Sequence, residues 1–279
     1  MQVNLVSCVF VLESEKNENI RKNDIKKLKI LVDKDNSLPY SIFNGGELKK
    51  QVRNDISNII GSDIFHLEQV FSMNYDNAID IIYLAVTNKE HILRLDDNFK
   101  LIDFGIKNNS EIMFDKDVFE YKTKEIIENN NVEYVHEINV DDMVLQRELM
   151  NLLISYKKIR GNIDSTDIIF KFMGDTFTLE DVRNVYELIK ECNVDISNLR
   201  KRIIKYCEKV DAVSAVKNGF RPSQRYKFKP LDNIKLIFEG EYLNSKNHLF
   251  GKEYHYPYHN IREIKFEGEF LNSERIKGK

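Results

Sequence analysis

Apolar residues in the first part of the chain form short stretches of strand length and one helical stripe. The stretches predict strands because polar or turn-forming residues bound them: 3–12, 28–32, 78–87 and 99–104. The stripe recurs at helical spacing: Leu48, Val52, Ile56, Ile59 and Ile60. A turn at Gly45-Gly46 precedes the stripe, and Gly61 is a stop signal after it. Residues 1–113 are therefore expected to form a domain of mixed strand and helix.

The next segment, residues 114–165, is more polar and is expected to be a helical linker. Its first part indicates a polar helix from about Asp115 to Glu128, followed by an asparagine-rich break at 129–131. A second, amphipathic helix is predicted over residues 140–157. Its apolar positions are Met143, Val144, Leu149, Leu152, Leu153 and Tyr156.

Residues 166–229 have the pattern of two helices and a strand. Thr178, with Asp181 at the third helical position, is typical of a helix start. The apolar face of this first helix is Leu179, Val182, Val185, Tyr186 and Ile189. A short turn at 192–194 follows, and a second helix is predicted to begin with Asp195 or Ser197 as its cap.

The second helix has one apolar and one basic side. The apolar side holds Ile196, Leu199, Ile203, Tyr206 and Cys207, and Cys207 is expected to be a small core residue. The opposite side holds Ser197, Asn198, Lys201 and Lys205, with Arg202 beside them. Basic and aromatic residues then alternate over 220–228, which predicts a β-wing. Together these features indicate a winged helix-turn-helix.

Residues 230–279 contain an internal repeat. Residues 238–245 and 266–273 lie 28 positions apart and are identical at seven of eight positions, which indicates a duplicated unit. Each copy alternates aromatic and acidic residues around a glycine, which favours one β-hairpin per copy. The acidic residues fit a binding strip and solvent-facing hairpin positions equally well: Glu239, Glu241, Glu267 and Glu269.

Charge is unevenly distributed along a chain whose net charge is −3. Residues 195–230 carry ten basic and three acidic side chains, so this segment is +7 and the remainder −10. A concentrated basic segment in an acidic protein can hold a polyanion. A solvated charged face is the alternative explanation. The location of these bases on a second helix and a wing favours contact with DNA.

Several classes of protein and site are disfavoured. The longest apolar run, residues 81–86, is far shorter than the ~20 residues that span a bilayer, so no membrane association is expected. The N-terminus lacks a secretory signal, and three cysteines without a C-x-x-C motif are typical of a cytoplasmic protein. His255 and His259 are separated by Pro257 and joined by no cluster of acids or cysteines, so neither a metal nor a cofactor is predicted.

Three parts of the chain resemble known families. One stretch of the first domain resembles the Nudix box of nucleoside-diphosphate hydrolases: Leu38-Pro39, Gly46-Glu47-Leu48, Arg53-Asn54-Asp55 and Gly61. Residues 66–70 and 80–86 resemble the continuation of that domain. Residues 177–187, 195–202 and 220–228 resemble the winged helix of the Nudix-related transcriptional regulators of NAD metabolism. Because the order of elements also fits, this resemblance covers residues 1–229. The repeats resemble MORN repeats, at a longer spacing than is usual for that family.

The resemblance implies an α+β chain with a Nudix-like α/β/α sandwich at 1–113 and a helical linker at 114–165. A winged helix-turn-helix at 166–229 and a small β-hairpin repeat extension at 230–279 complete it.

The Nudix-like box departs from the family where chemistry requires it most. Nudix hydrolases bind divalent metal ions with carboxylates of the box helix. With Gly61 aligned to the last glycine of the box, the two adjacent glutamates fall on Asn58 and Ile59. An amide and an aliphatic side chain cannot replace two carboxylates around Mg²⁺ or Mn²⁺. The domain is therefore expected to be catalytically degenerate, with no catalytic residue and no resident metal.

In the regulators that the chain resembles, this domain is a sensor for ADP-ribose or a related nucleotide. The acids that remain in the box, Glu47 and Asp55, are the candidate ligand-binding residues here, and ordinary surface acids are the alternative reading of both.

The expected function is that of a transcriptional regulator that binds double-stranded DNA, controlled by a nucleotide-type ligand. A homodimer is expected because two half-sites match a two-fold operator, and the resemblance implies the same. On the second helix, Lys201 and Arg202 are candidates for base edges or phosphates, and Asn198 for adenine. The remaining candidate DNA contacts are Ser197, Arg200, Lys205, Arg221, Gln224, Arg225 and Lys227.

Two other functions stay open. One is a Nudix-type pyrophosphatase that uses Glu47 and Asp55 with acids from elsewhere, and the missing box glutamates argue against it. The other is a protein-interaction scaffold in which the MORN-like repeats carry the function and the winged helix docks a protein. The +7 segment argues against that scaffold.

Overall fold

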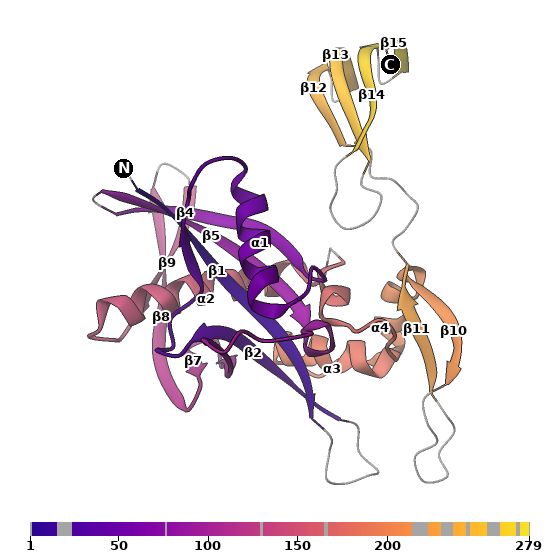
Figure 1. The fold of residues 1–279 in the computed structure, drawn as a ribbon. Coiled ribbons are helices and arrows are strands. Elements are labelled where there is room, and N and C mark those ends of the chain that lie inside the picture. Colours follow the sequence, from indigo (N-terminus) through magenta and orange to yellow (C-terminus); the bar gives the residue numbers. More distant parts are fainter. Residues whose placement is uncertain are drawn as a thin grey trace. The chain divides into compact units, whose positions relative to one another are not determined.

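The structure is a computed structural model (Figure 1), and it describes residues 2–15, 24–75, 77–128, 131–164, 167–213, 223–229, 237–243, 246–255, 263–271 and 274–278. The chain divides into two compact units. The larger comprises Met1–Ile203 and Lys209–Lys227, and the smaller comprises Ile204–Glu208 and Phe228–Lys279.

One large mixed sheet dominates the larger unit. Its strands are hydrogen-bonded in the order β4-β5-β1-β2-β6-β7-β8-β9, and the short β3 pairs with β1. Their bounds are β1 Gln2–Glu15, β2 Ile25–Asp33, β3 Tyr40–Ile42, β4 His66–Tyr75, β5 Ala78–Asn88, β6 Phe99–Lys107, β7 Glu111–Phe114, β8 Asp117–Glu128 and β9 Asn131–Ile138. The pair β1–β5 is parallel, and the other described pairs are antiparallel. The strands predicted from the four apolar stretches are β1, β2, β5 and β6.

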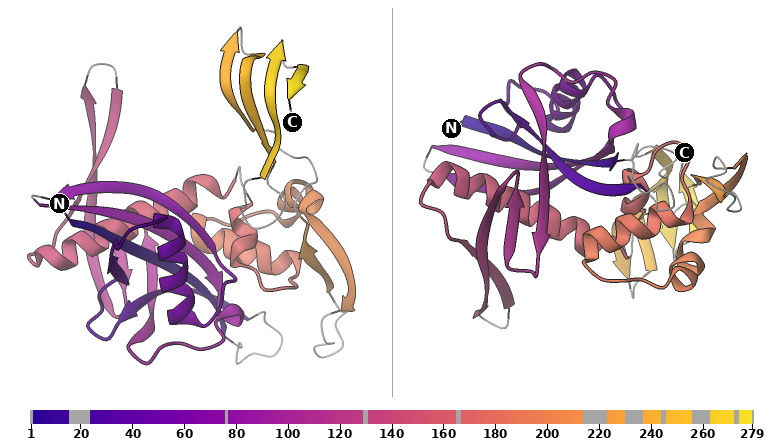
Figure 2. Two further views of the ribbon diagram at one scale, coloured as in Figure 1. Left: turned by 45° about the horizontal axis from the view of Figure 1, so that its top comes forward. Right: turned by 90° about the horizontal axis from the view of Figure 1, so that it is seen from below.

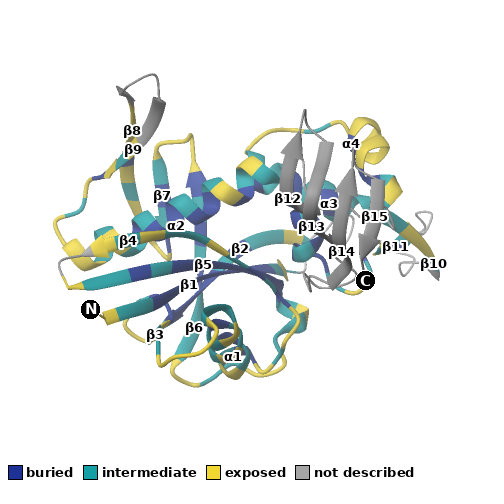
Figure 3. Cartoon of the chain, turned by 90° about the horizontal axis from the view of Figure 1, so that it is seen from above, coloured by how far each residue is buried: buried dark blue, intermediate teal, exposed yellow. Residues whose placement is uncertain are grey.

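Two helices cover opposite faces of this sheet (Figures 2 and 3). Alternate residues of β1 explain why both faces are apolar, because successive side chains of a strand point to opposite sides. Val9 and Val11 pack in a buried cluster with residues of α1 (Leu48–Ile60), whereas the ring of Phe10 on the other face lies 6.5 Å from the ring of Tyr156 in α2 (Met143–Asn162). Burial of each such side chain is worth roughly 1.5–3 kcal/mol. The predicted α/β/α sandwich is confirmed, although strands β8 and β9 and one of its two helical layers, α2, come from residues beyond 113.

Helix α1 (Leu48–Ile60) follows its sequence signals closely. Gly45 and Gly46 adopt positive φ angles of 106° and 89°, which an L side chain rarely accepts. Gly61 ends the helix in the left-handed conformation, and its N–H donates to the carbonyl of Ser57 at 2.8 Å. A Cβ at Gly61 would also lie 3.1 Å from the backbone nitrogen of Arg94, so glycine is favoured there for both reasons.

The prediction of a polar helix over residues 115–128 is wrong, because this segment is strand β8. Asp115, at a φ of 56°, begins the two-residue turn that folds β8 back on β7. Residues 121–128 of β8 pair with the whole length of β9, and Lys124 forms an ion pair with Glu137 across the two strands at 2.6 Å. These partners outweigh the helical preference of its Glu and Lys residues. Residues 129 and 130 of the predicted break lie outside the described part of the chain.

Helix α2 (Met143–Asn162) confirms the second amphipathic helix, although it begins three residues later and ends five residues later than predicted. Asp142 caps it, because its carboxylate accepts the backbone N–H of Val144 at 2.8 Å. Met143 and Val144 were expected on the apolar face but are 82% and 56% exposed. The buried stripe is Leu149, Asn151, Leu152, Leu153, Ser155, Tyr156 and Ile159.

The predicted helix-turn-helix is present as α3 (Leu179–Lys190) and α4 (Ile196–Ile203), after the 3₁₀ turn η2 (Ile168–Phe172). Helix α4 is shorter than predicted, since a 3₁₀ turn η3 (Ile204–Tyr206) follows it and strand β10 (Cys207–Val213) begins at Cys207. Placing Cys207 on the buried face of the helix was therefore wrong. It is partly buried in a strand that pairs with β11 (Gln224–Phe228), and this burial raises the pKa of its thiol to about 11.

In the smaller unit, the repeats form an antiparallel sheet in the order β12-β13-β14-β15. The strands are β12 Ile237–Leu243, β13 Lys246–His255, β14 Glu263–Leu271 and β15 Glu274–Gly278. Each copy of the repeat supplies the first strand of one hairpin, β12–β13 or β14–β15, as predicted. Equivalent glycines, Gly240 and Gly268, both lie opposite Gly251. The likeness to MORN repeats stays a prediction.

Candidate nucleic-acid interface

Helix α3 begins at the predicted cap and is tied there to the large sheet. The Thr178 hydroxyl accepts the N–H of Asp181 at 3.1 Å, and the Asp181 carboxylate accepts the N–H of Thr178 at 2.8 Å, which completes a capping box. The same carboxylate lies 3.0 Å from Nζ of Lys26 in β2. Burial acts to raise the pKa of Asp181, but Lys26 and the Thr178 hydrogen bonds outweigh it, so the pKa lies below its ordinary value.

The far end of α3 is capped by side chains from α2. The Tyr156 hydroxyl donates to the carbonyl of Ile189 at 2.8 Å, and Arg160 donates to the carbonyl of Lys190 at 3.0 Å. The last carbonyls of a helix have no partner within it, and a cation is favourable there. Arg160 also pairs with Glu191, at 3.1 Å, in the turn that follows. The linker helix thus determines where the turn between α3 and α4 lies.

Helix α4 presents one apolar and one polar side, as predicted. Leu199 and Ile203 are buried, whereas Ile196 is 36% exposed. Of the two possible caps, Asp195 is the one used, because its carboxylate accepts the N–H of Asn198 at 2.8 Å and Ser197 lies within the helix.

The side of α4 turned to solvent carries the predicted polar residues: Ser197, Asn198, Arg200 and Lys201 are all exposed. Among the described residues, neither Arg200 nor Lys201 has an ion-pair partner. Their charge is therefore available to a polyanion. Arg202 differs, because it donates to Asp164 at 2.7 Å and lies over the ring of Tyr186, with 5.4 Å between the guanidinium carbon and the ring centroid.

The wing begins from a strand that is anchored to the start of the domain. The backbones of Phe177 and Tyr226 exchange two hydrogen bonds, at 2.8 and 2.7 Å, and Tyr226 is buried. Arg225 donates to the hydroxyl of Thr176 at 2.9 Å and to its carbonyl at 2.6 Å. Lys227, two residues further along β11, is exposed.

Three other candidates in this region differ in their surroundings. Gln224 donates to the carbonyl of Val210 at 2.7 Å, so its amide holds β10 to β11. Lys205 belongs to the smaller compact unit, where its Nζ lies 5.0 Å from the ring centroid of Tyr206. Arg221 lies outside the described residues.

The two candidate ligand-binding acids are not brought together. Glu47 is exposed just before α1, with no hydrogen bond from its side chain to the start of the helix. Asp55 lies eight residues further on, about 12 Å along a helix axis, and accepts a hydrogen bond from Ser41 at 2.7 Å. At the positions of the absent glutamates, Asn58 is exposed and Ile59 packs against the core. No group of three or more His, Cys, Asp or Glu side chains among the described residues is placed to hold a metal ion.

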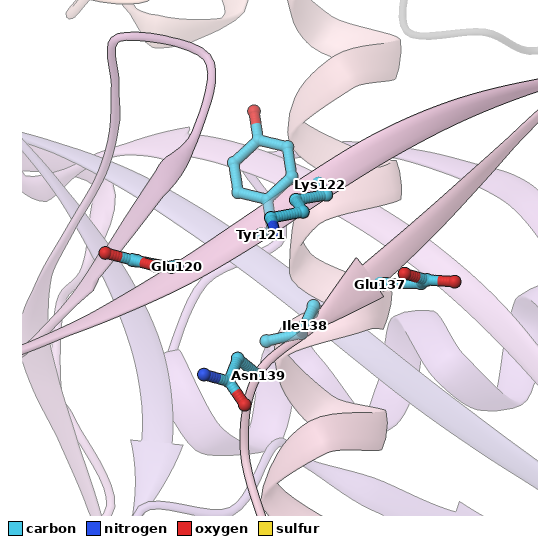
Figure 4. Close-up of a pocket in the computed structure, with 6 residues that line it drawn as sticks. All are labelled: Glu120, Tyr121, Lys122, Glu137, Ile138 and Asn139. Carbon is cyan, nitrogen blue, oxygen red and sulfur yellow. The ribbon is translucent and has the colours of Figure 1, made fainter.

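A surface pocket lies elsewhere, on the hairpin of β8 and β9 (Figure 4). Its lining residues are Glu120, Tyr121, Lys122, Glu137, Ile138 and Asn139. Neither Glu47 nor Asp55 contributes to it. Because charged and apolar groups alternate around it, no pattern in the sequence singled it out.

Comparison with known proteins identifies the helix-turn-helix. Residues 169–228 match the family model described as the NrtR DNA-binding winged helix domain. Comparison with curated proteins gave no match.

Among solved structures, NrtR of Shewanella oneidensis matches with a TM-score of 0.57 and 11% identity over 82% of this chain and 94% of that chain. The structure of the same protein complexed with a 27mer DNA matches with a TM-score of 0.56 and 11% identity over 81% and 93%. A MutT/nudix family protein from Enterococcus faecalis matches with a TM-score of 0.55 and 13% identity over 82% and 88%.

The two kinds of match carry different information. At 11–13% identity the solved structures establish the fold, whereas the family model establishes the type of the domain at 169–228. In the described part of the chain, no helix is both long and apolar enough to cross a bilayer. Residues 169–228 are thus an NrtR-type DNA-binding winged helix domain that follows a domain of Nudix-like fold in the sequence. This order of domains is the architecture of a Nudix-related winged-helix regulator.

Proposed function

We propose that the protein regulates transcription by binding double-stranded DNA through α4 and the wing, under the control of a nucleotide bound by the Nudix-like domain. The observation that carries this proposal is the outer face of α4, where Asn198, Arg200 and Lys201 are exposed within an NrtR-type winged helix. A helix presented in this way fits the major groove, where base edges can be read.

The candidate contacts divide by their surroundings. Asn198 and Lys201, on the outer face of α4, are proposed to meet base edges, with Ser197 and Arg200 beside them. Exposed Lys227 is proposed to meet phosphate, as are Lys205 and Arg221. Gln224 and Arg225 already donate hydrogen bonds to Val210 and Thr176, respectively. They are proposed to contact phosphate only through their remaining N–H groups.

The ligand and the assembly are part of the same proposal. A nucleotide such as ADP-ribose is proposed to bind the Nudix-like domain near α1, where Glu47 and Asp55 supply acceptors for its hydroxyl groups. A homodimer is proposed because it would place two copies of α4 on a two-fold operator. Binding to the chromosome is also the basis for proposing a cytoplasmic location.

The Nudix-like domain is proposed to have lost hydrolysis. Mg²⁺ or Mn²⁺ would need several oxygen ligands around the pyrophosphate, yet Ile59 is turned to the core and Asp55 is already bonded to Ser41. No turnover of ADP-ribose is therefore expected with either metal, measured by release of AMP. Turnover at an ordinary enzymatic rate that Glu47→Gln abolishes would instead show a Nudix-type pyrophosphatase.

Genomic footprinting of the tagged protein tests the DNA-binding function directly. Discrete protected sites are expected, and the purified protein should bind a duplex of the strongest site more tightly than a scrambled duplex. Lys201→Ala should reduce this preference, whereas Lys50→Ala, which removes an exposed lysine from α1, should not. Equal binding to both duplexes, unaffected by Lys201→Ala, would refute the proposal.

A second titration tests the sensor. Adding ADP-ribose should change the affinity for the recovered site, and Glu47→Gln should reduce that response without altering DNA binding in its absence. An affinity that is the same with and without ADP-ribose would exclude this nucleotide as the ligand.

A further inference from the structure

A single carboxylate links the end of α2 to helices α3 and α4 of the winged helix. Asp164 follows the end of α2, and its Oδ2 lies 2.6 Å from Nζ of Lys190, the last residue of α3. Its Oδ1 accepts hydrogen bonds from the Tyr186 hydroxyl of α3 at 2.5 Å and from the Arg202 guanidinium of α4 at 2.7 Å. Both oxygens are thus used, and the carboxylate that follows α2 binds side chains of both α3 and α4.

The charge of Asp164 is held firmly by these partners. The hydrogen bonds from Lys190 and Tyr186, together with Arg202, lower the pKa of Asp164 to about 2. The side chain of Asp164 is 42% exposed and that of Arg202 is 45% exposed, so each pair by itself contributes little to stability. The geometry is more important than the energy here, because three donors converge on one group and fix its position.

The contact decides how Arg202 is oriented. Its guanidinium donates to Asp164 and lies over the ring of Tyr186, so both of these contacts are made within the protein. Helix α4 has only eight residues, too few to be stable alone, so its orientation depends on its contacts. Leu199 and Ile203 hold one side of it and Asp195 caps its start, while Arg202 ties down its last turn.

We propose that Asp164 is a positioning residue for α4 and acts through Arg202, so that Arg202 does not itself read or neutralise DNA. This proposal rests on the DNA-binding function proposed above. Sequence-specific contact requires the reading side chains to be placed to within a fraction of an ångström, whereas attraction to phosphate tolerates misplacement. Loosening the last turn of α4 should therefore affect specific binding and leave non-specific binding almost unchanged.

The alternative, that Arg202 contacts DNA directly, makes the opposite predictions. Loss of a phosphate contact lowers the salt slope by about 0.9 and weakens binding to every sequence. Loss of Asp164 would then release Arg202 and remove a repelling negative charge, so binding would stay the same or become tighter. The Asp164 variant therefore separates the two roles.

The experiment measures the affinity of four variants for the footprinted duplex and its scrambled control, each over a range of salt. The variants are Asp164→Asn, Arg202→Gln, the double variant, and Asp167→Asn as the matched control. Asp167 is an acid three residues away that pairs with Lys171 at 3.0 Å and not with α4. The ratio of the two affinities cancels the uniform effect of each charge change.

Asp164→Asn and Arg202→Gln should each lower the specific-to-non-specific ratio by about tenfold, with the salt slope unchanged. The double variant should be no worse than either single one, and Asp167→Asn should keep the wild-type ratio. A lower salt slope in Arg202→Gln, an unchanged ratio in Asp164→Asn, or additive losses in the double variant would each overturn the proposal. Equal binding of the wild-type protein to both duplexes would instead refute the DNA-binding function on which the proposal rests.

Circular dichroism melting shows whether Asp164→Asn remains folded. If it unfolds, Arg202→Lys and Arg202→Gln decide the question. The lysine variant keeps a cation within reach of Asp164 and should recover most of the lost ratio, while both variants keep the wild-type salt slope. A ratio no better for lysine than for glutamine would overturn the positioning role.

Discussion

At the junction of the linker helix with the winged helix one hydrogen bond comes from a buried hydroxyl, and Tyr156→Phe removes only that group. The Tyr156 side chain is 2% exposed, and its hydroxyl donates at 2.8 Å to the carbonyl of Ile189 in the last turn of α3. Burial raises the pKa of Tyr156 above its ordinary value, so the hydroxyl is protonated at neutral pH and can donate. The aromatic contacts with Phe10 and Phe104 do not need the hydroxyl and should persist in the variant.

The expected cost follows from what the substitution leaves behind. The carbonyl of Ile189 lies near the end of α3, where no later residue of the helix can donate to it. A buried acceptor left without its partner costs roughly 1–3 kcal/mol, more than the net worth of an average hydrogen bond. Because a phenylalanine ring fills the same space, no cavity term adds to this.

Urea unfolding followed by circular dichroism measures this cost. Tyr156→Phe should lower the free energy of unfolding by roughly 1–3 kcal/mol with an unchanged slope against urea. The control is Tyr40→Phe, which removes a hydroxyl from a side chain that is 69% exposed and should change stability by less than about 0.5 kcal/mol. Hydrogen exchange should also become faster at the end of α3 in Tyr156→Phe. Stability within about 0.5 kcal/mol of the wild type would show that the Ile189 carbonyl does not depend on this bond.

Three further predictions follow from particular contacts. Lys201→Ala should lower the ratio of specific to non-specific DNA affinity, whereas Lys227→Ala should weaken both affinities and lower the salt slope by about one, as salt titrations on both duplexes would show. Deletion of residues 231–279 should leave the affinity for the footprinted site within a few-fold, because the cut falls beyond β11; complete loss of binding would place the repeats in the DNA-binding unit. The pKa of Asp164 lies at about 2 in the folded protein against an ordinary value of 3.8. Its contribution to the free energy of unfolding is therefore complete above about pH 4 and is lost as the pH falls toward 2. In acid unfolding measurements, Asp164→Asn should lack this part of the decrease in stability that the wild type shows.

Features that depend on neighbouring residues in the chain could be predicted from the sequence. Thr178 caps α3 with a carboxylate only three residues away, and Gly61 ends α1 because its own backbone can adopt a positive φ. The sequence repeat likewise predicts the two hairpins, because each hairpin is formed by segments that are adjacent in the sequence. Such signals lie within a few residues of one another, so no knowledge of the fold is needed to read them.

Strand β8 shows where local reading fails. Its Glu and Lys residues favour a helix in isolation, and only pairing with β7 and β9 makes it a strand. The end of α4 was misplaced for the same reason, since pairing with β11 begins β10 at Cys207. Strand propensity depends on the partner across the sheet, and an isolated segment does not contain that partner.

The candidate interface divides in the same way. The basic charge of α4 and the wing can be counted from the sequence alone. This charge indicates a DNA-binding domain, and the match to the family model supports that prediction. Whether a given cation is available was decided by tertiary neighbours: Arg202 meets Asp164 from 38 residues away, and Arg225 meets Thr176 from 49 residues away. Lys201 has the same formal charge as Arg202, and among the described residues it has no ion-pair partner. Charge is a property of the residue, whereas its neutralisation is a property of the group that folding brings beside it.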